Sequence, residues 1–522
     1  MNQSTERWVL TSTILASSMG FIDSTALNVA LSSIQASLHA SGAQLLWVIN
    51  GYLLMLASLI LVGGSLGDRW GRKRVFMAGI SLFVLASIAC GLSPSIQFMI
   101  AARIVQGIGG SLMIPGSLSI ITSMVAPDRR GRAIGTWSAI STLVTVVGPV
   151  LGGFLSDHGL WRVVFLINAP LGIFALIVLF IKVNESHDET IAGPIDVLGA
   201  ALATVGLAGL TYGFISAPGD GFKDPRVIGT LLIGVIALIA FIYVEAHTEY
   251  PMMPLGLFKS HTFSGANLLT LFLYGGLSAG TFFLSLNLIQ VQGYTKTEAG
   301  FSFLPFAFLL TIMSRWSGGL ADRQGPRLFL ILGPSLAGLG FFWMAFAGLT
   351  NGPASYWYAF LPGIALFGVG MGLTVAPLTA SVMGSVPIDH SGTASGINNA
   401  VSRTAGVLAI AIIGSAALFS FSNILNARTA SMNLSNQARL SLNLEAQKLA
   451  GASVPAAVGP EMVQAVGQSI KLAFVDTFKL IMIICAIMAW VSAAAAAVLI
   501  APRVQVESNV PRRLPPEEEC CA

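Results

Sequence analysis

Residues 64 to 75 read GSLGDRWGRKRV and separate two long apolar runs. This short connection contains one acidic residue, Asp68, and four basic ones, Arg69, Arg72, Lys73 and Arg74. A connection of this length between two apolar runs must lie at a membrane surface, and short loops rich in Lys and Arg face the cytoplasm. Its glycines, Gly64, Gly67 and Gly71, allow two helices to turn sharply, and Asp68 can stabilise the start of the second helix. We therefore predict a cytoplasmic gate loop between two membrane helices; a plain cytoplasmic anchor is the alternative.

The same pattern returns later in the chain. Residues 318 to 327 read GGLADRQGPR, and their acid and following arginine, Asp322 and Arg323, come 254 positions after Asp68 and Arg69. A further pair of glycine motifs, at 107 to 109 and 368 to 370, is separated by 261 positions. Two repeats at nearly equal spacing indicate a duplicated chain with two equivalent halves.

Composition indicates a membrane protein that crosses the bilayer many times. Of the 522 residues, 54% are hydrophobic and only 10% are charged, and the mean hydropathy is +0.79. The net charge of +4 is small and the cations gather in short loops, which argues against a nucleic-acid partner. The sequence contains no Walker phosphate loop, and its six histidines have no metal-ligand spacing, so we expect neither a cofactor nor a metal.

Apolar runs of about 20 residues predict fourteen membrane helices. The predicted spans are 8 to 30, 44 to 66, 75 to 93, 96 to 117, 132 to 155, 161 to 183, 195 to 216, 226 to 246, 262 to 291, 298 to 318, 327 to 348, 355 to 377, 393 to 421 and 472 to 500. The fold class is thus an all-α membrane protein with two six-helix bundles and two inserted helices. A twelve-helix protein with two buried hairpins is the alternative.

The predicted units follow from these spans. They are an N-terminal bundle at 1 to 185, an inserted pair at 186 to 250, a C-terminal bundle at 251 to 501 with an outward segment at about 422 to 471, and a cytoplasmic tail at 502 to 522. The short loops opposite the basic ones contain only Arg162, Lys223, Arg226 and Lys296, so both termini are predicted to be cytoplasmic. Within the outward segment, residues 440 to 449 have the pattern of a short amphipathic helix.

Asp23 is the only carboxylate well inside a predicted span, and Arg103 lies at a matching depth in the fourth span. An acid in the hydrocarbon region is a functional hypothesis by default. A buried carboxylate with a movable arginine beside it can bind and release a proton, and a cationic substrate that reached Asp23 would favour its ionised form. The second half has Ile364 at the position that corresponds to Arg103. The alternative is an ion pair that only fixes helix packing.

The fifth span contains Gly148, Pro149, Gly152 and Gly153. The glycines form a face without side chains, and the proline permits bending. We predict that Gly148 and Gly152 let the two halves approach closely, although ordinary helix packing also explains such spacing. Candidates for a substrate cavity are Trp47, Trp137, Tyr274, Phe282, Phe283, Asn287, Gln290 and Met371.

These motifs resemble those of one transporter family. The 64 to 73 stretch resembles the loop between helices 2 and 3 of the major facilitator superfamily, and residues 103 to 110 (RIVQGIGG) resemble its helix 4 signature. Residues 21 to 31 (FIDSTALNVAL) resemble the helix 1 signature of its fourteen-helix drug:proton antiporters. Residues 148 to 153 (GPVLGG) resemble the helix 5 motif of exporters.

The resemblance implies a multidrug efflux protein that exports lipophilic, often cationic, drugs or other amphiphiles in exchange for protons. It implies the proton gradient as the energy source, proton coupling through Arg103, and alternating access. The expected setting is the cytoplasmic membrane, with lipids, protons and a small amphiphile as partners and a monomer as the working unit. Unlike several relatives, helices 10 and 13 contain no acid, which leaves Arg403 as an intramembrane cation that could meet an anionic headgroup or bond to Asn398 or Asn399.

Other functions are less consistent with the sequence. The same architecture could export a lipid or an amphiphilic metabolite. A membrane sensor would need a signalling domain, which this sequence does not show. A membrane-embedded enzyme would need a nucleophile, and Asp23 with Arg103 supplies none. We therefore predict a transporter rather than an enzyme.

Overall fold

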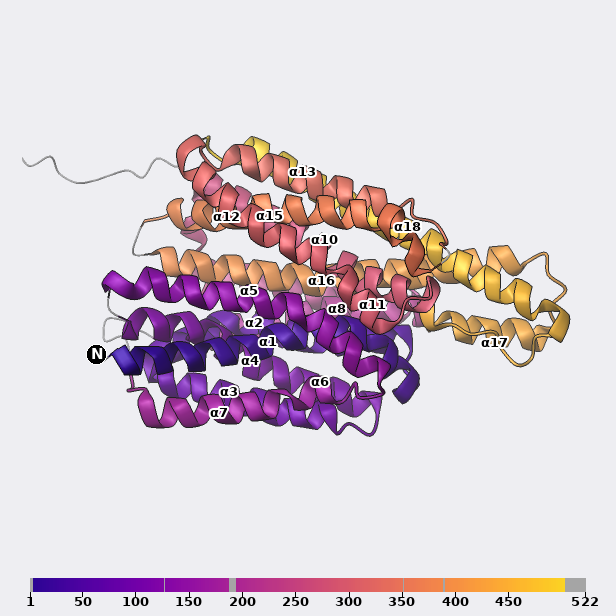
Figure 1. The fold of residues 1–522 in the computed structure, drawn as a ribbon, viewed down its shortest axis with the longest axis horizontal. Helices are drawn as coiled ribbons and strands as arrows, with labels where there is room; N and C mark the ends of the chain where they lie inside the picture. Colours follow the sequence, from indigo (N-terminus) through magenta and orange to yellow (C-terminus); the bar gives the residue numbers. More distant parts are fainter. Residues whose placement is uncertain (1–2, 126, 187–193, 351, 388–389, 503–522) are drawn as a thin grey trace, which may run out of the picture.

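The computed structural model describes residues 3–125, 127–186, 194–350, 352–387 and 390–502, and every regular element in these ranges is a helix (Figure 1). Thirteen helical segments are long and apolar enough to cross a membrane. The fifth predicted span is the 31-residue helix α5 (Pro127–Asp157), whose apolar part is shorter. The predicted all-α membrane fold with fourteen helices is confirmed.

The other spans follow the predicted order. They are α1 (Gln3–Leu38), α2 (Gly42–Trp70), α3 (Arg72–Gly91), α4 (Ile96–Met124), α6 with α7 (Val163–Leu166 and Asn168–Lys182), α8 (Val197–Asp220), α9 (Pro225–His247), α10 (His261–Leu286), α11 with α12 (Lys296–Ser302 and Leu304–Gln324), α13 (Arg327–Met344), α14 with α15 (Tyr356–Ala359 and Leu361–Gly384), α16 (Ser391–Thr429) and α18 (Val463–Leu499).

Local sequence explains where several helices begin. The Ser41 hydroxyl accepts a hydrogen bond from the backbone N–H of Gln44, whose side chain bonds back to Ser41, so α2 begins with a capping box. Thr295 and Glu298 form the same arrangement at the start of α11. In these positions the side chains satisfy backbone donors that have no partner inside the helix.

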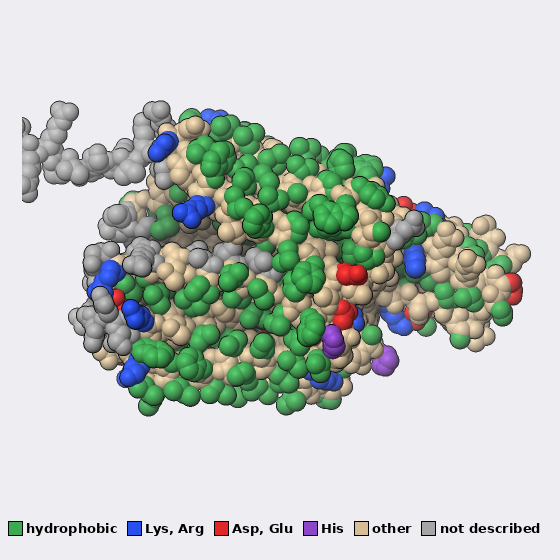
Figure 2. All heavy atoms as spheres, viewed as in Figure 1, with side chains coloured by type: hydrophobic (Ala, Val, Ile, Leu, Met, Phe, Trp, Pro, Cys, Tyr) green, Lys and Arg blue, Asp and Glu red, His purple; other side chains and the backbone are tan. Residues whose placement is uncertain are grey.

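The helices form two groups that lie side by side (Figure 1). Helices α1 to α7 make up one group, whereas α10 to α15 and α18 make up most of the other, and α16 packs against both α2 and α10. Inserted helix α8 contacts α2 and α16, and α9 packs against α8. Hydrophobic side chains cover the middle of the visible face, with charged side chains mainly toward its two ends (Figure 2). This distribution suits a protein whose middle faces lipid.

The segment at 422 to 471 is more helical than predicted. Helix α16 continues to Thr429 and α18 begins at Val463, so both extend past the predicted spans. Between them lies α17 (Asn436–Ala446), which confirms a short helix here but begins before residue 440. The extensions form because Leu425, Val466 and Ile470 are buried in the main apolar cluster. We call residues 422 to 471 the lobe; it lies at the end of the molecule opposite the N-terminus (Figure 1).

Candidate functional site

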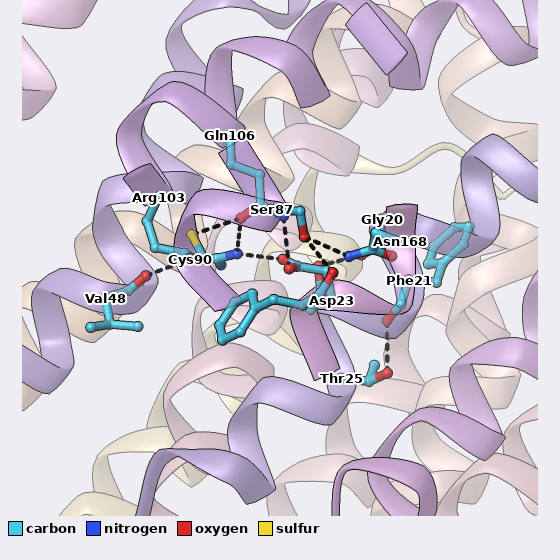
Figure 3. Close-up of polar contacts among 12 residues, drawn as sticks. Gly20, Phe21, Asp23, Thr25, Val48, Ser87, Cys90, Arg103, Gln106 and Asn168 are labelled. Atoms are coloured by element: carbon cyan, nitrogen blue, oxygen red, sulfur yellow. Dashed lines mark hydrogen bonds and ion pairs between the residues drawn. The ribbon is translucent and has the colours of Figure 1, made fainter. Parts of the chain in front are cut away.

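Asp23 of α1 and Arg103 of α4 are in direct contact (Figure 3). Nη1 of Arg103 lies 2.5 Å from Oδ2 of Asp23, and both side chains are almost completely buried. Helices α1 and α4 pack against each other, and this packing brings the two side chains to one depth. The structure thus brings together the two residues that the sequence placed at matching depth.

Gln106 completes this pair and was not predicted as a member of the site. Its Nε2 donates a hydrogen bond to Oδ1 of Asp23 at 2.9 Å, and its Oε1 accepts one from Nη1 of Arg103 at 2.7 Å (Figure 3). Each oxygen of the Asp23 carboxylate therefore has its own donor. The spacing from Arg103 to Gln106 is three residues, which puts both on one face of a helix, so the sequence did contain this signal.

The guanidinium of Arg103 is held from three sides. Its Nε donates to the backbone carbonyl of Val48 at 3.0 Å, and its centre lies 4.5 Å from the ring centroid of Tyr52 and 5.9 Å from that of Phe165. A buried charge is tolerated only when it is paired and hydrogen-bonded, and these contacts meet that requirement. Nothing in the sequence pattern marked Tyr52 or Phe165 as neighbours of Arg103.

The glycines of α5 separate into two contact faces. A Cβ atom on Gly148 would lie 1.9 Å from Oγ1 of Thr25, and one on Gly152 would lie 2.4 Å from the carbonyl oxygen of Ala26. Both neighbours belong to α1, in the same half. The prediction that Gly148 and Gly152 contact the other half is therefore wrong for this arrangement, because these two positions face α1 instead.

The other face of α5 does meet the second half. A Cβ atom on Gly153 would lie 2.3 Å from the carbonyl oxygen of Lys296, and one on Gly300 of α11 would lie 2.4 Å from that of Pro149. Beside this contact, the Asp157 carboxylate accepts hydrogen bonds from the backbone N–H groups of Lys296 at 3.0 Å and Thr297 at 2.8 Å. Asp157 thus caps α11 across the boundary between the halves, a role that the sequence analysis missed.

The gate loop contacts its own half of the chain. Oδ1 of Asp68 lies 2.7 Å from Nε of Arg72 and accepts a hydrogen bond from Ser119 of α4 at 3.4 Å. Nη2 of Arg69 donates to the carbonyl of Pro194 at 3.3 Å, and a Cβ atom on Gly64 would lie 3.8 Å from Pro115. The loop thus holds together α2, α3, α4 and the connection to the inserted helices.

Gly71 and Glu185 explain the shape of this loop. Gly71 has a φ of +107°, a backbone conformation that residues with a Cβ atom rarely adopt. A Cβ atom there would also lie 2.5 Å from the Glu185 carboxyl carbon. That carboxylate accepts hydrogen bonds from the backbone N–H groups of Lys73 at 2.9 Å and Arg74 at 3.1 Å, so Glu185 caps α3. Glu185 was another residue that sequence analysis missed.

The repeated loop has matching geometry. Gly325, which lies 254 positions after Gly71, has a φ of +89° and ends α12 as Gly71 ends α2. Arg323 is exposed, whereas the side chain of Asp322 lies outside the part of the chain that the structure describes. The duplication seen in the sequence therefore extends to the backbone conformation of the turn.

Most of the candidate cavity residues lie in packed regions. Trp47 faces the ring of Tyr212 on α8 at 6.4 Å, and Nε1 of Trp137 donates to Ser17 at 3.0 Å. Phe282 packs against Phe283, and Met371 is buried in the main apolar cluster.

Two polar candidates lie toward the lobe. Asn287 is buried in the π-helical turn that follows α10. Nε2 of Gln290 donates to Oε1 of Gln35 at 2.9 Å, which joins the two halves.

Tyr274 lines a small cavity in the second half, and Arg403 directly follows another lining residue, Ser402, on α16. The cavity has a volume of about 100 Å³. Its lining consists of Tyr274, Thr379, Val382, Met383, Ser395, Asn398, Asn399 and Ser402. Nδ2 of Asn398 donates to Asn267 at 3.1 Å and to Thr270 at 2.7 Å, so its amide is used by α10 rather than by Arg403.

A sequence-family comparison decides the identity of the fold. The model of the Major Facilitator Superfamily matches residues 13–410. This chain belongs to the major facilitator superfamily. Among its relatives is the tetracenomycin C resistance and export protein of Streptomyces glaucescens, which is 32% identical over 408 residues covering 77% of this chain and 75% of that protein. The methylenomycin A resistance protein of Bacillus subtilis is 31% identical over 401 residues covering 76% of this chain and 84% of that protein.

Solved structures of the superfamily share the fold. A bacterial homologue of the human lysosomal transporter Spinster, in an inward-facing and unoccupied conformation, aligns with a TM-score of 0.66 and 18% identity over 96% of this chain and 99% of that chain. A peptide transporter in complex with sulfate aligns with a TM-score of 0.61 and 14% identity over 95% of both chains. Members of this superfamily are multi-pass membrane transporters of small molecules, and this chain is one of them.

Proposed function

We propose that this chain is a proton-coupled antiporter that exports lipophilic drugs or other amphiphiles across the cytoplasmic membrane. Its similarity to proteins named for antibiotic resistance and export supports the direction and the substrate class. The single observation that supports proton coupling is the buried set of Asp23, Arg103 and Gln106. The proposal involves no catalysis, no cofactor and no metal, with the proton gradient as energy source and a monomer as working unit.

The orientation in the proposal has both termini in the cytoplasm. The basic gate loop between α2 and α3 lies at the same end as the N-terminus, which supports this orientation through the excess of cations in cytoplasmic loops. The lobe then lies outside. The two halves are in contact near the lobe through Gly153, Gly300 and Asp157, so in an alternating-access cycle this arrangement has its outer side closed.

In the proposed cycle, the contacts around Asp23 change with the conformation. In the arrangement described here, both oxygens of the Asp23 carboxylate accept hydrogen bonds from Arg103 and Gln106, and we assign this arrangement to the step after proton release toward the cytoplasm. When the outer side opens, a shift of α1 against α4 would remove these donors, and Asp23 would take up a proton because an unpaired charge is costly in the hydrocarbon region. One proton then moves inward for each outward step of the substrate.

The test is transport by purified protein in proteoliposomes under an imposed pH gradient. A panel of fluorescent amphiphiles, including lipids, would identify a substrate. With that substrate, Asp23→Asn should lose gradient-driven accumulation, because Asn cannot carry the proton. Exchange of labelled for unlabelled substrate without a gradient should persist in the variant and serves as the control. Accumulation by Asp23→Asn at the wild-type rate would show that another group carries the proton.

A further inference from the structure

Arg403 occupies a central position between the two halves of the chain. It lies on α16, three residues before Gly406, whose Cβ position is 3.0 Å from Oγ of Ser278 on α10 and 3.7 Å from Leu53 on α2. This part of α16 is therefore in contact with both halves. Gly396, two turns before Arg403 on the same helix, likewise has its Cβ position 3.3 Å from Leu61 of α2.

The charge of Arg403 is not compensated within the described part of the chain. The ion pairs described there join acidic side chains to Arg72, Arg74, Arg103, Arg129, Arg428 and Lys448, and none of them includes Arg403. Asp23, the carboxylate well inside the predicted spans, already has Arg103 and Gln106 as partners and is 0% exposed. A substrate that reached this part of α16 would therefore meet a positive charge that no described carboxylate pairs with.

The cavity lined by Asn399 and Ser402, which are four residues and one residue before Arg403 on α16, suits a small polar group rather than a whole drug. Its volume of about 100 Å³ is well below the ~300–1,000 Å³ of typical ligand pockets. Hydroxyl and amide groups of Tyr274, Ser395, Asn399 and Ser402 line it and can donate hydrogen bonds. A guanidinium next to such donors is a favourable setting for a carboxylate or another oxyanion.

We propose that Arg403 binds the anionic group of the exported amphiphile, with that group seated in the adjoining cavity lined by Tyr274. This inference rests on the proposed export function and narrows its substrate class. It differs from the cationic substrates that the family resemblance implies, since an uncompensated arginine repels a cation in a low-dielectric cavity. The hydrophobic body of the amphiphile would remain between the two halves.

The test uses equilibrium binding to purified protein in neutral detergent, which requires no proton gradient and no transport. Three fluorescent probes share one hydrophobic body and carry a carboxylate, its methyl ester or a quaternary ammonium group. For the wild type we expect the carboxylate to bind most tightly and the ammonium most weakly. Arg403→Gln should weaken carboxylate binding by about 10- to 100-fold, as expected for the loss of a charge-assisted hydrogen bond, and leave the ester unchanged.

Two further variants keep the result interpretable. Arg403→Lys retains the charge and should keep part of the preference for the carboxylate, even if Arg403→Gln fails to fold. Arg315→Gln removes an exposed arginine of α12, which lies on a different groove, and should bind all three probes as the wild type does. Equal wild-type affinity for carboxylate and ester, or tighter binding of the ammonium probe, would overturn the proposal, as would an equal loss for both probes in Arg403→Gln.

An anionic lipid headgroup offers the same chemistry as an anionic drug. Nanodiscs of phosphatidylglycerol or phosphatidylcholine distinguish these sources. Competition with the carboxylate probe by phosphatidylglycerol, in the wild type but not in Arg403→Gln, would support the oxyanion site and assign it to a lipid. Absence of competition together with tight carboxylate binding would support it and assign it to the exported compound. If the carboxylate binds at Arg403 but pH-driven export fails, the site stands and proton coupling is wrong.

Discussion

The two halves of this transporter share their turns but differ in how they hold charge inside the membrane. In the first half, Arg103 is buried against Asp23 and Gln106, and every partner comes from that half. At the corresponding position the second half has Ile364, which is buried in an apolar cluster. The second half instead carries Arg403, which is partly exposed and has no acidic partner among the described residues.

Under the proposed function, this difference separates two tasks, proton coupling and substrate binding. A fully paired carboxylate can change its proton content only when its surroundings move, so it reports the conformation of the protein. An unpaired arginine at the boundary between the halves is available to a ligand. The two halves share one helical arrangement. Differences at a few positions, such as Arg103 in the first half and Ile364 in the second, give each half a different arrangement of charges.

The largest expected effect comes from making the first half resemble the second. Arg103→Ile would leave the buried Asp23 carboxylate without its cation, and breaking a buried pair costs about 3–5 kcal/mol. We expect a marked loss of thermal stability in detergent together with loss of pH-driven transport. The measurement is thermal unfolding of purified protein, followed by the transport assay.

The double variant Asp23→Asn with Arg103→Ile provides the matched control. Because both charges are removed, stability should return most of the way toward the wild type, while proton-driven transport stays absent. Ile364→Leu in the second half should change little, since it conserves volume in an apolar site. If the double variant were no more stable than Arg103→Ile alone, the pair would not be the reason for the loss.

The glycines of α5 allow a comparison of contacts within one half and between halves. Gly152→Ala would place a Cβ atom against α1, and Gly153→Ala would place one against the carbonyl of Lys296 in the second half. Each should cost about 1–3 kcal/mol through overpacking. Only Gly153→Ala strains the contact between the halves, which the proposed orientation places on the outer side, so it alone should increase labelling of a cysteine introduced near that contact.

Gly229→Ala is the control for both glycine variants, because no atom lies within 4 Å of its Cβ position on α9. We expect wild-type stability and labelling from it. An increase in outer labelling with Gly152→Ala equal to that with Gly153→Ala would contradict the assignment of the two faces.

The sequence predicted the fold and the pair of Asp23 and Arg103. It did not predict the contacts that depend on which face each helix turns toward its neighbours. The fourteen spans follow from apolar runs, and Asp23 with Arg103 follows from depth alone. Hydrophobicity in a membrane helix says little about which face meets which neighbour, because lipid and protein surroundings are both apolar. For that reason the direction of Gly148 and Gly152, the cap by Glu185 and the contact of Asp157 were found only in the structure.

A smaller effect is expected at the turn that both halves share. Gly71→Ala would force a residue with a Cβ atom into a φ of +107° and push it toward the Glu185 carboxylate. The left-handed conformation alone costs about 1–2 kcal/mol.

Gly71→Ala should therefore lower the melting temperature by a few degrees and increase the rate of proteolytic cleavage between α2 and α3. Gly135→Ala, whose Cβ position has no neighbour within 4 Å, is the control. Unchanged stability would mean that the loop adapts.

The lobe connects the two halves of the chain. It joins α16 to α18 in the second half and contacts α1 and α2 in the first. The backbone N–H of Gly42 donates to the carbonyl of Gln447 at 2.8 Å, and Nε2 of Gln35 donates to that of Lys448 at 3.0 Å. Leu449, which follows, has a φ of +55°, an uncommon conformation for a residue with a side chain. Glu445 supports this turn by accepting hydrogen bonds from Nζ of Lys448 and from the backbone N–H of Ser453.

The smallest predicted effect concerns Glu445. Burial acts to raise the pKa of its carboxyl, but the hydrogen bonds from Lys448 and Ser453 outweigh burial and hold the pKa below the usual value of 4.5. A lowered pKa in the folded state means that this group stabilises the lobe above about pH 4.5 and that the stabilisation is lost as pH falls through the folded-state pKa. Because Lys448 is partly exposed, we expect the ionised Glu445 to contribute only about 0.5–1 kcal/mol to the stability of the fold.

Glu445→Gln should lower the melting temperature slightly at pH 7 and should reduce the fall of the melting temperature below pH 4.5. Glu461→Gln, in the same lobe, should change neither quantity. An unchanged melting temperature at pH 7 would contradict this prediction. If cysteine labelling at the lobe side were faster in the same variant, the turn would affect the contact between the halves without adding to overall stability.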